Sequence, residues 1–131
     1  MMDSKEVFDK IETCLTKALN EEDGIMLEGR KIDFEHYKYK MEHWGKVCSE
    51  PKDSKFVKVC ILQDSDFPEM WHIAIWGAKY YNSAAIYAVK ELDKQFGEIA
   101  LVSENEHFYV EDAFGIAITF NPGEIKLETN S

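Results

Sequence analysis

Residues 69–97 constrain the fold more than any other stretch, because an apolar strand leads there through a short connection into an amphipathic helix. The strand has the sequence Trp71-His72-Ile73-Ala74-Ile75-Trp76. Successive side chains of a strand point to opposite faces, so both faces of this strand are largely apolar. A strand that is covered on both faces belongs in the middle of a sheet.

The helix that follows is predicted over residues 83–96. Its apolar residues fall on one side at 100° per residue. They are Ala85, Ile86, Val89, Leu92 and Phe96. Asn82 or Ser83 is a suitable N-cap, and Gly97 suits a left-handed residue at the C-terminal end. We therefore expect this apolar side to pack on a sheet or on another helix.

Two further helices and a short strand are predicted before this point. Residues 3–20 have helical periodicity, and Asp3 with Glu6 matches a capping box. Residues 25–27 form a possible short strand. A helix is expected over 33–48, because its apolar residues step by three and four. These residues are Phe34, Tyr37, Met41, Trp44 and Cys48.

The remaining apolar runs predict strands. Residues 56–62 form one strand, and the loop 63–68 connects it to the Trp71 strand as a hairpin. Four short runs follow the last helix, at 99–103, 107–111, 115–120 and 125–128, and their short connections imply antiparallel neighbours. We expect a single globular domain over 1–131 of the α+β class. About three helices would pack on a mostly antiparallel sheet of five to seven strands, in the order helix, short strand, helix, two strands, helix and four-strand meander.

The charge of the chain favours some partners over others. It has 25 acidic and 15 basic residues, for a formal net charge of -10 at pH 7. A negative field repels phosphate backbones and the basic residues do not cluster, so no direct nucleic-acid binding is expected. A basic protein is the electrostatic complement. The alternative is that the acidity only keeps a small domain soluble.

Cysteine usage and hydropathy indicate a cytoplasmic protein. Cys14, Cys48 and Cys60 are widely spaced and odd in number, which argues against a disulfide framework and predicts reduced, buried thiols. No segment approaches the ~20 apolar residues of a membrane span. Residues 1–20 also lack the apolar core of a signal peptide. We expect a soluble cytoplasmic chain with no membrane partner.

No motif for catalysis or cofactor binding is present. The histidines and cysteines lack the spacings of zinc sites, and Walker, G-x-G-x-x-G and G-x-S-x-G sequences are absent. The loop that starts at Asp64 lacks the glycine and glutamate that an EF-hand needs. His72 is interpreted as a structural histidine in preference to a general base working with Glu111 or Asp112. We predict no catalytic residue, no metal and no cofactor, and hence no enzyme.

Exposed tyrosines near acidic residues are instead typical of protein-recognition surfaces. The segment Tyr80-Tyr81 is one candidate. The acidic loop 64–69 and the acidic hairpin 104–112 are the others. The predicted partner-binding residues are Asp64, Asp66, Glu69, Tyr80, Tyr81, Glu104, Glu106, Glu111 and Asp112.

Two functions from different classes fit these observations. The first is an acidic binding protein that neutralises a basic protein partner, such as a toxin or nuclease, by occlusion with charge-assisted hydrogen bonds. In size, acidity and lack of catalytic motifs the chain resembles small bacterial immunity proteins as a class, which implies an immunity or antitoxin role. The alternative is a ligand-binding or enzymatic α+β domain with a pocket between sheet and helices, near His72 and Trp76.

Overall fold

One mixed sheet with helices on both sides makes up the fold. The computed structural model describes residues 2–97, 100–110 and 113–123. Its helices are α1 (Ser4–Gly24), α2 (Tyr81–Phe96) and the short 3-10 helix η1 (Met41–Lys46). Its strands are β1 (Lys31–Tyr39), β2 (Phe56–Asp64), β3 (Trp71–Trp76), β4 (Ala100–Val110) and β5 (Ala113–Asn121). They lie in the order β1-β2-β3-β5-β4. β1 is parallel to β2, and the other neighbouring pairs are antiparallel.

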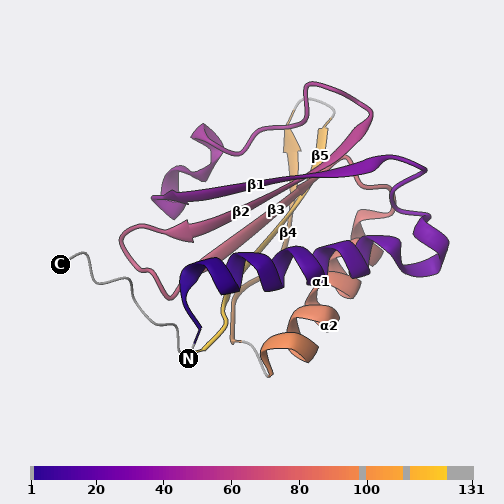
Figure 1. The fold of residues 1–131 in the computed structure, drawn as a ribbon. Coiled ribbons are helices and arrows are strands. Elements are labelled where there is room, and N and C mark those ends of the chain that lie inside the picture. Colours follow the sequence, from indigo (N-terminus) through magenta and orange to yellow (C-terminus); the bar gives the residue numbers. More distant parts are fainter. Residues whose placement is uncertain (1, 98–99, 111–112, 124–131) are drawn as a thin grey trace.

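The two faces of the sheet carry separate cores. Figure 1 shows α1 and α2 on one side of the strands and η1 on the other. The core under α1 and α2 includes Phe8, Ile11, Leu15, Val59, Ile73, Leu92, Ile118 and Phe120. The core under η1 and the loop after it consists of Cys48, Cys60, Leu62, Ala74 and Trp76. The alternation of each strand therefore places its residues in one core or the other.

β3 occupies the position that its sequence predicts. All six of its residues are buried. β3 pairs with β2 through a hairpin, from Gln63↔Trp71 to Lys58↔Trp76, and with β5 on its other side. The central strand and the hairpin are therefore confirmed.

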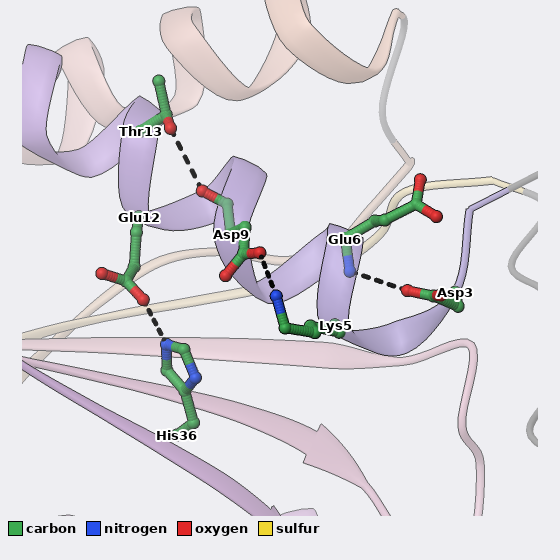
Figure 2. Close-up of polar contacts among 7 residues, drawn as sticks. All are labelled: Asp3, Lys5, Glu6, Asp9, Glu12, Thr13 and His36. Atoms are coloured by element: carbon green, nitrogen blue, oxygen red, sulfur yellow. Dashed lines mark hydrogen bonds and ion pairs between the residues drawn. The ribbon is translucent and has the colours of Figure 1, made fainter.

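The first helix is also confirmed, and it begins at the predicted cap. Asp3 is extended and its Oδ1 accepts a hydrogen bond of 2.9 Å from the backbone N–H of Glu6, as Figure 2 shows. On the exposed surface of α1, Lys5 contacts Asp9 at 3.1 Å. α1 continues to Gly24, with non-helical backbone angles at residues 21–23.

Removal of this cap tests the start of α1. Asp3→Ala should lower the free energy of unfolding by about 1 kcal/mol, because one N–H of the first turn loses its acceptor. Asp3→Asn keeps an acceptor oxygen and should lose a few tenths of a kcal/mol at most. Urea denaturation of both variants measures the difference. Equal losses in the two variants would show that the cap oxygen is not the stabilising group.

The predicted helix over residues 33–48 is wrong. Residues 31–39 form strand β1, and only 41–46 are helical, as η1. All nine residues of β1 pair with β2, from Lys31↔Phe56 to Tyr39↔Asp64. Aromatic and β-branched residues favour a strand, and this pairing outweighs the helical spacing of a few apolar residues. Phe34 consequently lies against the core under α1, whereas Tyr37 packs on the core under η1.

β1 contacts α1 through a histidine. The ring of His36 stacks on Phe8 with 4.5 Å between centroids, and its Nε2 lies 2.7 Å from the Glu12 carboxylate (Figure 2). His43 lies in η1, outside this strand. His36 therefore helps to hold the edge strand against the helix.

α2 exists as predicted, and most of its predicted apolar side lies in or against the core under α1, but its cap and the position of Ile86 differ. It begins at Tyr81, and the N-cap Tyr80 makes no side-chain capping bond, so Asn82 and Ser83 are not the cap. Gly97 has the expected positive φ, of 73°. Ile86 was predicted to be buried but is 55% exposed. The buried residues are Ala84, Ala85, Ala88, Glu91 and Leu92. Small alanine side chains let α2 approach α1 closely, which rotates the bulkier Ile86 outward.

Other parts of the predicted element order are wrong. Residues 25–29 form turns, with Met26 and Leu27 buried in the core under α1, so no strand exists at 25–27. The described parts of the predicted strands 99–103 and 107–111 are one strand, β4, whose pairing with β5 has irregular register between Leu101 and Glu106. Residues 99 and 111 lie outside the described residues. The predicted strand 125–128 lies outside the described residues. The α+β class is confirmed, whereas the order of elements is not.

Candidate functional site

Three segments meet at the end of the sheet where β1 and β2 begin and β3 ends. They are residues 21–28, the connection 77–80 and helix α2. The backbone N–H of Lys79 donates to the carbonyl of Met26 at 3.0 Å. The Lys79 ammonium also lies 3.4 Å from Glu28. The Tyr87 hydroxyl donates to Glu22 at 2.5 Å, which ties α2 to the end of α1. These contacts bring residues far apart in sequence onto one surface. We call it the Tyr80 corner, consisting of Glu21, Glu22, Asp23, Ile25, Glu28, Lys79 and Tyr80.

Arg30 stabilises the Tyr80 corner through contacts with two of its segments. Its guanidinium donates to the carbonyl of Leu27 at 2.9 Å and to that of Gly77 at 2.6 Å. It also lies 3.6 Å from Glu28. Gly77 has φ +87°, and a Cβ there would lie 3.4 Å from the guanidinium. The only arginine in the sequence therefore holds the turn after α1 against the connection that precedes α2.

Exposed apolar and acidic side chains are combined at this corner. Tyr80 is 51% exposed and Ile25 is 43% exposed, and the two residues flank the Lys79–Met26 hydrogen bond. Glu22, Asp23 and Glu28 are exposed around them. Lys79 and Arg30 both contact Glu28, whereas residues 21–23 form no ion pair with any residue that the structure describes. Aromatic residues ringed by charges are typical of protein-recognition surfaces.

Backbone strain gathers at the same place. In the described part of the chain, the non-glycine residues with positive φ are Glu22 (52°), Asp23 (60°), Glu28 (51°) and Tyr80 (53°). All four belong to the Tyr80 corner. A left-handed conformation costs roughly 1–2 kcal/mol for a residue with a Cβ. Such strain is concentrated at functional surfaces more often than elsewhere.

The structure separates the two predicted tyrosines by exposure. Tyr80 is exposed, as a partner-binding residue must be. Tyr81 is half-buried and packs on the core under α1. Tyr80 is therefore the one of this pair that is available to a partner.

The predicted acidic loop lies at the other end of the sheet. Asp64 is 8% exposed, and its Oδ1 accepts the backbone N–H of Asp66 at 2.9 Å, which stabilises the turn. Asp66 and Glu69 are exposed. Since β3 runs from this loop toward the Tyr80 corner, Asp66 and Glu69 cannot share a continuous surface with Tyr80 (Figure 1).

The predicted acidic hairpin is only partly described. Glu104 and Glu106 belong to β4, where Glu106 pairs with Ala117. Glu111 and Asp112 lie outside the described residues. The acidic run 21–28, which follows the predicted first helix, was not predicted as a site. The density of acidic residues could have indicated a charged surface there. The contact of this run with Lys79 is tertiary, so no pattern in the local sequence predicts it.

His72 and Trp76 lie on the sheet face opposite α1 and α2, so the predicted pocket between sheet and helices does not include them. His72 is 3% exposed, and its Nδ1 lies 2.8 Å from the Thr119 hydroxyl. The ring of Trp44, from η1, covers it at 5.0 Å. Burial lowers the pKa of His72 to about 4, which keeps the imidazole neutral at pH 7. His72 is thus a buried, hydrogen-bonded histidine, as its structural interpretation predicts.

A second polar group lies beside the core under η1. Lys58, buried on β2, contacts Glu35 of β1 at 3.1 Å, and the Tyr37 hydroxyl donates to the same carboxylate oxygen. Burial acts to raise the pKa of Glu35, but these two hydrogen bonds outweigh it and lower the pKa below its usual value. A surface hollow of about 490 Å³ opens here. Its lining includes Tyr37, Val47 and Lys58.

Within residues 2–97, 100–110 and 113–123, no three His, Cys, Asp or Glu side chains are grouped to hold a metal ion. No described helix is long and apolar enough to cross a membrane. Comparisons of the chain with protein-family models, with curated proteins and with solved structures find no match. The function is therefore inferred from the residues of this chain.

Proposed function

We propose that this chain is a small acidic cytoplasmic binding protein that neutralises a basic protein partner by occlusion, as an immunity or antitoxin protein does. The observation that carries the proposal is the Tyr80 corner, where an exposed tyrosine and isoleucine lie among exposed carboxylates. The net charge of -10 supplies a field that attracts a cationic protein.

Each part of the corner has a role in this mechanism. The Tyr80 ring supplies rigid apolar area that becomes buried against the partner. Glu22 and Asp23 form charge-assisted hydrogen bonds with lysine or arginine side chains and fix the orientation of docking. Arg30 and Lys79 hold the three segments in place before the partner arrives, which lowers the entropy cost of binding. The partner is inhibited because the bound domain covers its basic functional surface.

Site-specific photocrosslinking tests where the partner docks. A benzophenone-bearing phenylalanine replaces Tyr80 in one variant and Phe67 in the other. Phe67 is a matched control because it is 61% exposed and lies in the loop at the opposite end of the sheet. After irradiation in an extract of the native host, the Tyr80 variant should capture one predominant protein rich in lysine and arginine. The Phe67 variant should not capture that protein.

Two outcomes contradict the proposal. Capture of the basic protein only by the Phe67 variant would place the interface on the predicted loop 64–69. Equal, diffuse labelling of many proteins by both variants would show that the acidity serves solubility and not recognition.

A further inference from the structure

Two of the three cysteines meet in the core under η1, although they lie on different elements. Cys60 is in the middle of β2, and Cys48 lies in the segment that follows η1. Both are buried, and both pack with Leu62, Ala74 and Trp76. Cys14 is also buried, but it lies in the other core, where its thiol faces the Glu91 carbonyl at 3.5 Å.

Cys48 and Cys60 pack in the same small core cluster, and their interaction makes the two thiols chemically unequal. The interaction with Cys60 raises the pKa of Cys48, and burial acts in the same direction. The interaction with Cys48 and the nearby Lys58 ammonium lower the pKa of Cys60 and outweigh burial, which acts to raise it. Cys60 is therefore the better thiolate, and Cys48 is the adjacent thiol that can resolve a mixed disulfide.

The surroundings provide a route for a small reagent. Val47, next to Cys48 in the chain, and Lys58, on the same strand face as Cys60, both line the 490 Å³ hollow. The segment that carries Cys48 is irregular between η1 and β2, so it can shift more readily than a strand. A low-molecular-weight disulfide in the hollow lies beside Val47 and Lys58, and it reaches the two buried thiols when the segment that carries Cys48 shifts.

We infer that Cys48 and Cys60 form a reversible disulfide by exchange with a low-molecular-weight disulfide, and that this bond fastens residues 41–55 to the sheet. The Cys60 thiolate attacks one sulfur of the small disulfide, which forms a mixed disulfide and expels one thiolate. That thiolate accepts the proton of Cys48. The Cys48 sulfur then attacks the Cys60 sulfur and expels the second thiolate. The second thiolate takes up the proton that Cys60 released when it ionised. The protein thus loses two protons and two electrons, and the small disulfide becomes two thiols.

The disulfide changes how the core under η1 opens. In the reduced chain, residues 41–55 are held by packing, including the Trp44 ring against His72 and Trp76. In the oxidised chain, the segment after η1 is covalently linked to β2. Transient opening of this cover is then suppressed, because a crosslink restricts the opened state.

Treatment of the full chain with oxidised glutathione tests this inference. Two of the three thiols should disappear, and the protein mass should fall by two hydrogens. Trypsin cleaves after Lys52, Lys55 and Lys58, so the disulfide should join peptide 47–52 to peptide 59–79. Amide hydrogen exchange within 41–55 should slow by at least about tenfold, and reduction should reverse every change.

Variants assign the roles of the sulfurs. Cys48→Ser should stop at a glutathione adduct on Cys60, Cys60→Ser should show neither adduct nor disulfide, and Cys14→Ser should behave as the unmodified chain does. The inference is overturned if all three thiols of the unmodified chain stay free, or if glutathione adducts accumulate without the Cys48–Cys60 link. Reaction of Cys14 at the same rate would also overturn it, because that result requires general unfolding.

Discussion

Trp71→Ala is expected to lower the free energy of unfolding by roughly 3–5 kcal/mol. Trp71 is completely buried on the central strand, and its ring meets that of Phe8 edge-on with 4.7 Å between centroids. Among the described residues its Nε1 has no hydrogen-bond partner, so the loss arises from packing and the cavity left behind. Urea denaturation, monitored by far-ultraviolet circular dichroism, measures this change in the free energy of unfolding.

Ile86→Ala is the matched comparison for this variant. The helical spacing predicted Ile86 to be buried, yet more than half of its surface is exposed. Its truncation should change stability by no more than about 0.5 kcal/mol. Trp71→Phe keeps a ring against Phe8 and should fall between these values. A loss for Ile86→Ala as large as that for Trp71→Ala would mean that α2 presents its predicted side to the core.

Acidification should destabilise the protein through His72. The pKa of this buried imidazole is about 4 in the folded chain, against 6.5 in the unfolded chain. Between these values the unfolded state binds the proton more strongly, so folding stability is complete above pH 6.5 and falls as the pH decreases toward 4. The difference corresponds to roughly 3 kcal/mol at pH 4.

Comparison of two histidine variants isolates this contribution. The slope of stability against pH between 6.5 and 4 should be clearly smaller in His72→Gln than in the unmodified chain, whatever its stability at pH 7. His43→Gln, in which an exposed histidine of η1 is replaced, should keep the original slope. Equal slopes for His72→Gln and the unmodified chain would show that His72 is protonated in the folded state.

The elements that could be predicted from the sequence are those whose pattern agrees with their tertiary contacts. The strand Trp71–Trp76 has no polar face, so only the middle of a sheet can accommodate it. Helix α1 has an apolar stripe and a true cap at Asp3. In both cases local preference and packing favour the same structure.

The errors arose where a local pattern competed with a distant partner. Phe34 and Tyr37 have helical spacing, but the parallel pairing of β1 with β2 depends on a strand that lies some 20 residues later in the chain. Ile86 is apolar, but the buried residues of α2 are three alanines with Glu91 and Leu92. Patterns over ten residues do not contain this information.

The candidate site was predictable in part for the same reason. Tyr80 was identified from its residue type and its place in a connection. Its acidic neighbours at 21–28 were missed, because a single backbone bond between Lys79 and Met26 creates that neighbourhood. Asp64 was predicted to bind the partner, but its carboxylate accepts a hydrogen bond within its own turn, from the backbone N–H of Asp66.

The most direct test of the proposed function measures binding of the captured basic protein to two matched charge reversals. Glu21→Lys with Asp23→Lys alters the Tyr80 corner and leaves the Glu22–Tyr87 hydrogen bond in place, and Asp66→Lys with Glu69→Lys makes the same change in net charge at the opposite end of the sheet. At low ionic strength, calorimetry should show at least about tenfold weaker binding for the first pair and no more than about threefold for the second. Added salt should weaken binding of the unmodified chain most. Equal affinities for the two pairs, or binding that salt does not change, would contradict recognition through the Tyr80 corner.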